Sequence, residues 1–180
     1  MKIKYNAPVI LTYALTALSL LFFSSNSLMA TWFSSPAHLS FSNPYFYFRS
    51  VSYIFGHANW HHLMNNLTII LLVGPLLEEK VGSGNLLLMI CITAVTTAFL
   101  NAVLFSSSLI GGSGIAFMLI LLSSFSNIRS REIPLTFIMV AILFIGGEVV
   151  SILKTDNISQ FSHLSGGFVG ACYGFMKSGK

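Results

Sequence analysis

Charged residues are scarce in this chain of 180 residues. Asp, Glu, Lys and Arg together make up 8% of it, against about 25% in an ordinary soluble domain, whereas apolar residues make up 54%. This imbalance excludes a typical water-soluble domain and predicts an integral membrane protein whose main partner is the lipid bilayer. The formal net charge of +4 does not indicate a nucleic-acid surface, because the basic residues are not clustered on one element.

The groups that acid proteases and disulfide scaffolds need are equally few. Asp156 is the only aspartate, and an aspartyl protease needs two carboxyl groups that share one site. The two cysteines, Cys91 and Cys172, both fall in apolar segments and lack Cys-x-x-Cys spacing. We therefore expect them to be packing residues rather than a disulfide or part of a metal site.

The histidines of the chain raise the alternative of a zinc site. His57 and His61 are four residues apart and His62 follows directly, which is a spacing that zinc can use. However, the His-Glu-x-x-His motif of membrane zinc proteases is absent, and no carboxylate lies nearby as a third ligand or base. We expect no metal and no other cofactor.

Long apolar runs are what the chain has in abundance. A helix needs about 20 mostly apolar residues to cross a bilayer. Candidate spans, of which the fourth is short, lie at residues 8–29, 59–77, 85–105, 113–125, 133–153 and 160–176. They predict an all-α membrane protein in which residues 1–180 form one domain, a bundle of six transmembrane helices.

The distribution of Lys and Arg gives this bundle an orientation. If the N-terminus is cytoplasmic, seven basic residues lie inside and two lie outside, which obeys the positive-inside rule. The inside set is Lys2, Lys4, Lys80, Arg129, Arg131, Lys177 and Lys180, and the outside set is Arg49 and Lys154. Changing the number of spans by one would break this pattern, so we expect both termini in the cytoplasm.

Residues 30–58 do not fit either a spanning helix or a solvated loop. Pro36 and Pro44 interrupt the stretch, yet it is unusually rich in aromatic residues. Aromatic side chains favour the membrane–water interface. The stretch is either a folded loop that lies partly in the outer leaflet beside the functional site, or an interfacial anchor without contact to that site.

Ser113 is the first candidate for chemistry, because it stands in Gly111-Gly112-Ser113-Gly114 at the start of the fourth apolar run. Glycines tolerate a tight turn, and a helix start offers unpaired backbone N–H groups to a developing oxyanion. A serine hydroxyl is a weak nucleophile unless a base removes its proton. The alternative is structural, since Gly/Ser motifs are common where membrane helices pack closely.

His163 is the candidate base. Gly166, Gly170 and Gly174 follow it at intervals of three, seven and eleven residues, and these positions share one helical face. A glycine face lets another backbone come close. If that backbone is the start of the fourth run, an imidazole reaches Ser113 and acts as a general base. The structural alternative is a histidine bonded to a backbone carbonyl.

Two polar pairs on the second run are candidates for oxyanion donors. His62 and Asn66 are one helical turn apart, and so are His61 and Asn65. Two neutral donors on one face can stabilise an oxyanion, or they can simply bond a neighbouring helix. Spacing does not choose between the pairs. Glu148, inside the fifth run, receives no role, although an acidic residue at membrane depth needs protonation or a partner.

Taken in order, these motifs resemble those of the rhomboid family of intramembrane serine proteases. The matching segments are Phe48-Arg49, His62-Leu63-Met64-Asn65-Asn66, residues 74–84 with Glu78, Gly111-Gly112-Ser113-Gly114, and His163 with Gly166 and Gly170. The resemblance covers about residues 44–174. It favours His62 and Asn66 over the neighbouring pair.

The resemblance implies a small bacterial rhomboid protease in the cytoplasmic (inner) membrane. Ser113 would be the nucleophile and His163 the base, and the Ser113 N–H, His62 and Asn66 would hold the oxyanion in a cavity open to the outside. Gly111, Gly112 and Gly114 would support the turn. The substrates would be transmembrane-anchored proteins that are cut at or near the outer membrane boundary, without a cofactor.

Three positions depart from the family pattern without removing a catalytic atom. Phe48 replaces a tryptophan, Phe117 replaces a tyrosine, and Ser162 replaces an alanine. A catalytically inactive rhomboid-like binder or chaperone is the main alternative, but such relatives lose the serine or the histidine. A small transporter would need inverted repeats or an ionisable pathway, which Glu148 alone does not supply.

Overall fold

The structure is a computed structural model that describes residues 6–125, 135, 138, 139, 142, 164–170 and 172. Its elements are α1 (Pro8–Phe23), α2 (Asn26–Trp32), α3 (Pro44–Ser52), the 3₁₀ turn η1 (Tyr53–Phe55), α4 (Trp60–Val81), α5 (Ser83–Leu104) and α6 (Ser113–Phe125). Residues 164–170 are also helical, and no strand occurs in the described residues. The all-α class is therefore confirmed. Most of the predicted spans at 133–153 and 160–176, together with Glu148, lies outside the described residues.

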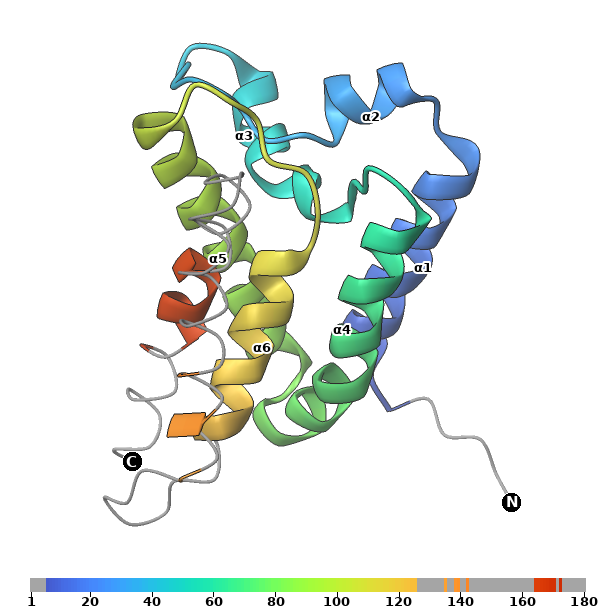
Figure 1. Cartoon of the computed structure of the whole chain (residues 1–180), viewed down its shortest axis with the longest axis vertical. Helices are drawn as coiled ribbons and strands as arrows, with labels where there is room; N and C mark the ends of the chain where they lie inside the picture. The colour runs from blue at the N-terminus through green and yellow to red at the C-terminus, as the bar shows by residue number, and fades with distance from the viewer. Residues whose placement is uncertain are drawn as a thin grey trace.

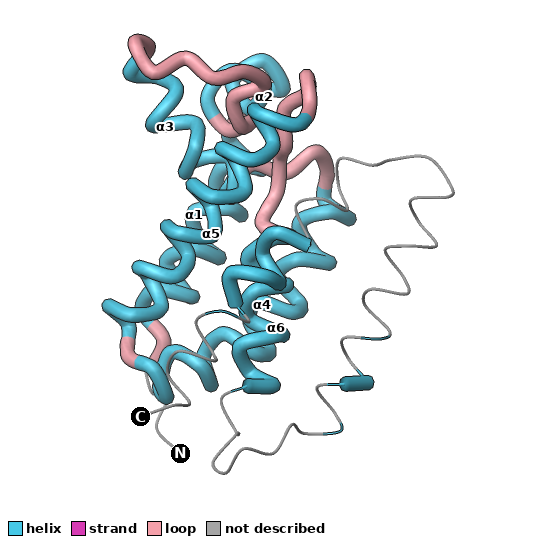
Figure 2. The backbone as a smooth tube through the Cα atoms, turned by 90° about the vertical axis from the view of Figure 1, so that its left-hand side faces the viewer, coloured by secondary structure: helices cyan, strands magenta, loops and turns pink. Residues whose placement is uncertain are grey.

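Among the described helices, α1, α4, α5 and α6 run side by side, and the short helices α2 and α3 lie across one end of them (Figure 1). α4 begins at this end, and the loop from α5 to α6 also lies there. The starts of α4 and α6 are therefore close to each other (Figure 1). Figure 2 shows from the side that the loops gather mainly around α2 and α3. The bundle thus collects the start of α4, the start of α6 and the aromatic stretch at one end.

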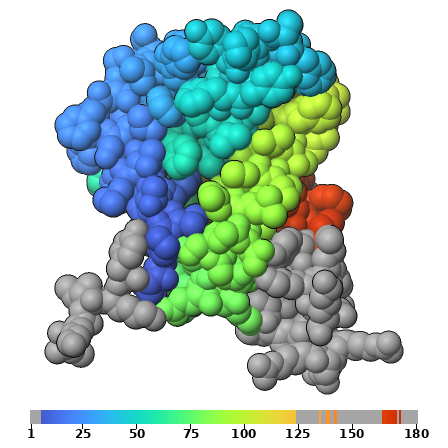
Figure 3. Space-filling model, turned by 180° about the vertical axis from the view of Figure 1, so that it is seen from behind, coloured from blue at the N-terminus to red at the C-terminus, as the bar shows by residue number. Residues whose placement is uncertain are grey.

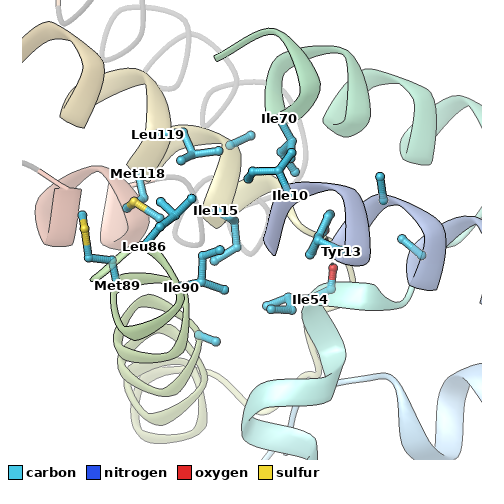
Figure 4. Packing of buried hydrophobic residues seen from close by; sticks show 14 of the residues in the cluster. Ile10, Tyr13, Ile54, Ile70, Leu86, Met89, Ile90, Ile115, Met118 and Leu119 are labelled. Atoms are coloured by element: carbon cyan, nitrogen blue, oxygen red, sulfur yellow. Dashed lines mark hydrogen bonds between the residues drawn. The ribbon is translucent and has the colours of Figure 1, made fainter. Parts of the chain in front are cut away.

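The centre of the bundle is built from apolar side chains of all four long helices. Figure 4 shows them converging between the helices, together with Ile54 from η1. The members that are less than 2% exposed include Ile10, Ile70, Leu86, Ile115 and Leu119. Close packing of this kind contributes to helix association in a bilayer, where the hydrophobic effect does not drive helices together.

One described helix is long and apolar enough to cross a membrane by itself. It is α5, with a mean hydropathy of 2.2 over its most apolar window, whereas Pro8–Phe23 and Ser113–Ser123 are shorter apolar helices. The short fourth run was expected from the sequence. The first predicted helix, over 8–29, is wrong in its last six residues: α1 ends at Phe23, and Ser25 caps α2 by accepting the Leu28 N–H at 3.2 Å. Serine side chains compete for backbone groups and so favour such a break.

The aromatic stretch is folded, and it contacts the loop that leads to α6. The Arg49 guanidinium donates to the Ser34 carbonyl and hydroxyl at 2.8 and 2.9 Å and to the Ser35 carbonyl at 3.1 Å. Ser35 in turn exchanges two hydrogen bonds of 2.8 Å with the backbone of Leu109. Trp32, Tyr45 and Phe48 pack edge to face near the surface of this layer, which covers the end of the bundle in Figure 3. The stretch is thus folded, as the first alternative predicts, and its position in the outer leaflet stays a prediction.

Glu78 ties the other end of the bundle together. Its carboxylate is 2% exposed and accepts the backbone N–H groups of Val9 and Ile10, each at 3.0 Å, and the Ser83 hydroxyl at 2.7 Å. Val9 and Ile10 lie in the first turn of α1, whose N–H groups have no partner within the helix. The backbone donors thus come from α1, and the turn after α4 contributes a side-chain hydroxyl.

We expect Glu78→Gln to lower the free energy of unfolding by about 1–3 kcal/mol, because an amide nitrogen cannot accept one of these buried donors. Glu79→Gln is the matched control: Glu79 is exposed and accepts from the Asn6 side chain. Its effect should stay below about 0.5 kcal/mol. Thermal unfolding of both variants in the same detergent measures the difference, and equal shifts would contradict the role given to Glu78.

Candidate active site

Ser113 is the first residue of α6, and its side chain is partly exposed. The turn before it is held by the Gly111 N–H, which donates to the Tyr53 carbonyl at 3.1 Å, and by the Ala116 N–H, which donates to the Gly112 carbonyl at 3.0 Å. Gly111 has φ +119°, a conformation that residues with a side chain rarely adopt. A β-carbon on Gly112 would overlap the Tyr13 hydroxyl, which donates to Ile54 O at 2.7 Å. Both glycines are thus required locally.

His62 and Asn66 lie near the start of α4. Asn59 begins this helix by accepting the His62 backbone N–H at 2.9 Å. Asn66 is 6% exposed and the His62 side chain is partly buried, whereas His61 and Asn65 are both exposed. The inward face of α4 is therefore the one that carries His62 and Asn66.

The turn before Ser113 meets this inward face directly. A β-carbon placed on Gly111 would lie 2.6 Å from Cε1 and 2.7 Å from Nε2 of His62, and 3.6 Å from Nδ2 of Asn66. The absence of a side chain at Gly111 is what lets both polar groups approach the Gly-x-Ser-Gly turn. The structure thus brings His62 and Asn66 next to the residue two positions before Ser113.

His163 lies outside the described residues, but the helix that follows it packs on α6. A β-carbon on Gly166 would overlap the backbone of Gly114, and one on Gly170 would lie 2.6 Å from the carbonyl oxygen of Met118. The glycine face expected from the sequence is therefore in backbone contact with α6, beginning next to Ser113. Residues 164–170 lie beside α5 and α6 in Figure 1.

Gly166→Ala should force this helix away from α6, because the new methyl group meets backbone that cannot rotate aside. We expect the free energy of unfolding to fall by at least about 2 kcal/mol. Gly167→Ala is the matched control: its β-carbon would approach only the end of the Leu121 side chain, at 2.8 Å, and its gain in helix propensity is the same. Thermal unfolding compares the two, and an equally stable Gly166→Ala protein would refute the tight packing.

Polar residues on α5 were missed by the sequence reasoning. Thr93, Thr97 and Asn101 are buried at intervals of four residues in an otherwise apolar helix, and this interval was the available signal. The Thr97 and Ser165 hydroxyls are 2.8 Å apart, and the Asn101 amide donates to the Ser107 carbonyl at 2.7 Å. These contacts join α5 to the glycine-faced helix and to the loop before Ser113.

The contacts of His57 with the predicted oxyanion donors were also missed, because the sequence reasoning considered His57 only as a metal ligand. Its side chain is 2% exposed; Nδ1 donates to the Phe55 carbonyl at 3.1 Å, and Nε2 lies 3.0 Å from Nδ2 of Asn66. Its ring meets the His62 ring edge to face, with centroids 5.0 Å apart. Burial lowers the pKa of His57 to about 4, although the hydrogen bond to the Phe55 carbonyl favours the charged ring. His57 is therefore neutral at physiological pH.

Among the described residues, no three His, Cys, Asp or Glu side chains converge on a point where they would hold a metal ion. Chemically, the site combines a hydroxyl at a helix start, a glycine turn that admits close approach, and neutral imidazole and amide groups. Such an arrangement can supply a nucleophile and hydrogen-bond donors to an oxyanion.

The fold and this arrangement define an α-helical bundle with a polar site at one end, and one of its described helices, α5, is long and apolar enough to cross a membrane. A family model described as "Rhomboid domain" matches residues 44–180. The chain is also 28% identical over 141 residues to "Rhomboid-related protein 1" of Caenorhabditis elegans, an alignment that covers 71% of this chain and 39% of that protein. The chain thus spans about two fifths of the length of that curated relative.

The chain belongs to the rhomboid family, and it is an integral membrane protein of that family. This confirms the resemblance inferred from the motifs. The roles of Ser113, His163, His62 and Asn66 remain predictions, as does the support by Gly111, Gly112 and Gly114.

Proposed function

We propose that this protein is an intramembrane serine endopeptidase that cleaves transmembrane-anchored proteins at or near the outer membrane boundary. The observation that carries the proposal is the contact of three separate segments around the Gly-x-Ser-Gly turn. Gly111 lies against His62 and Asn66 of α4, and Gly166, in the helical residues 164–170, lies against the backbone of Gly114. These segments carry the motifs of nucleophile, donors and base.

In this proposal the Ser113 hydroxyl attacks the scissile carbonyl while His163 takes its proton. The carbonyl oxygen becomes an oxyanion, which accepts hydrogen bonds from the Ser113 N–H and from the His62 and Asn66 side chains. Collapse of this intermediate breaks the C–N bond, and protonated His163 returns its proton to the leaving amine. Water then hydrolyses the acyl-enzyme by the same steps, so no metal or organic cofactor takes part.

We further propose six transmembrane helices in one domain over residues 1–180, in the cytoplasmic (inner) membrane of a bacterium. Both termini would be cytoplasmic, which agrees with seven basic residues inside and two outside. In this topology Ser113, at the start of the fourth span, is on the outer side. The family membership and the apolar helices support the membrane part of this proposal.

Comparative proteomics of membranes tests the proposal and searches for substrates at once. Cells that express the wild-type chain should release new soluble fragments of single-span membrane proteins, and cells with Ser113→Ala should not. Equal fragment patterns, with equal amounts of both proteins in the membrane, would refute proteolysis. That outcome would favour the alternative, a catalytically inactive rhomboid-like binder or chaperone.

A further inference from the structure

The side-chain amide of Asn66 has two orientations of nearly the same shape. Rotation by 180° exchanges its oxygen and its NH₂ group, so packing alone does not choose between them. The choice decides its chemistry: one orientation turns N–H donors toward the glycine turn, and the other turns an acceptor there. An acceptor would repel an oxyanion. Something beside Asn66 must therefore select the orientation.

His57 has the geometry to make that choice. A carbonyl oxygen only accepts hydrogen bonds, so the contact of 3.1 Å between His57 Nδ1 and Phe55 O places the ring hydrogen on Nδ1. In a neutral ring Nε2 then has only a lone pair. The Asn66 atom at 3.0 Å from it must be the nitrogen, which donates one of its two hydrogens.

The same nitrogen of Asn66 is the atom that faces the glycine turn. It lies 3.6 Å from a β-carbon placed on Gly111, so the nitrogen that donates to His57 also borders the glycine turn, and it has a second hydrogen to donate. The His62 ring also packs on the His57 ring, with ring centroids 5.0 Å apart. His57 is thus in contact with both predicted oxyanion donors, although it comes from the loop before α4.

We propose that His57 is a positioning residue: the chain Phe55 carbonyl–His57–Asn66 holds the Asn66 amide with its nitrogen toward the Gly111–Ser113 turn. The proposal deepens the proposed function and rests on it. His57 does not touch the substrate. The burial that keeps the ring neutral supports the mechanism, because a proton on Nε2 would demand the amide oxygen and reverse Asn66.

Two substitutions of His57 separate positioning from bulk. His57→Gln keeps an acceptor at the place of Nε2, and His57→Leu keeps similar volume without one. We expect His57→Leu to lower kcat on a transmembrane reporter substrate about tenfold with KM within about twofold, since the lost orientation matters in the transition state. His57→Gln should recover kcat to within about threefold of wild type.

A double-mutant cycle with Asn66→Ala gives the decisive comparison. Because His57 acts through Asn66, His57→Leu should cause no further loss of kcat in the Asn66→Ala background. The same tenfold loss in both backgrounds would overturn the proposal and leave His57 a structural residue. The wild type and Ser113→Ala are assayed in parallel. Equal activity of these two proteins would refute the proposed function, whereas the cycle tests the role of His57 alone.

A second measurement does not depend on activity. The ¹⁵N chemical shifts of histidine-labelled wild-type protein in detergent micelles report which ring nitrogen carries the hydrogen. We expect one neutral histidine with hydrogen on Nδ1 and none on Nε2, a signal that disappears in His57→Gln. A His57 ring with hydrogen on Nε2 would overturn the proposal, because it could not accept from Asn66.

Discussion

Replacing Ser113 by alanine is expected to reduce cleavage of a transmembrane reporter substrate to background, a fall of at least about 10³-fold. Alanine removes the only atom that forms the acyl-enzyme in the proposed mechanism. The protein should still accumulate in membranes, because Ser113 is partly exposed at the start of α6 and the variant creates no buried cavity. Reporter turnover per amount of folded protein is the measurement.

His163→Ala should reduce the same activity to the same level, since the hydroxyl is a poor nucleophile without a base. Nucleophile and base act as a unit, so the double variant should be no worse than either single one. Ser106→Ala is the matched control, because Ser106 is exposed in the loop before α6. Clear residual turnover in Ser113→Ala, beyond that of a preparation from cells without the protein, would refute the assignment of the nucleophile.

Alanine at His62 or Asn66 is expected to lower kcat by about 10-fold to 10³-fold with a smaller effect on KM. The hydrogen bonds that these side chains give to the oxyanion exist only in the transition state, so their loss affects kcat. Some activity should remain, because the Ser113 backbone N–H is untouched. A fluorophosphonate probe should still label Ser113 in Asn66→Ala, though more slowly.

The adjacent residues provide the controls for this series. His61 and Asn65 have the same side chains and the same spacing, but they lie on the exposed face of α4. Alanine at either position should leave kcat within about threefold of wild type and alter mainly stability or expression. If His61→Ala and Asn65→Ala were the damaging pair, the register of the motif on α4 would be wrong by one residue.

The scarcity of charge and the length of the apolar runs were enough to predict an all-α membrane protein, and ordered motifs were enough to predict its family. Local rules also located the start of α6 at Ser113 and of α4 within one residue. These features depend on composition and on periodicity within a single helix, which the sequence states directly. The break after Phe23 was missed because Ser24, Ser25 and Asn26 interrupt an apolar run only briefly.

Partners that come from distant segments were decided by the tertiary structure. Glu78 bonds the start of α1, 68 and 69 residues earlier in the chain, and Gly166 touches the backbone of Gly114. The link from His57 to Asn66 depends on how the loop after η1 enters α4 and on which ring nitrogen meets a carbonyl. Spacing reports which residues share a face of one helix; it does not report which helix covers that face or how a side chain is turned there. Helix packing and the need to pair buried polar groups decided these contacts.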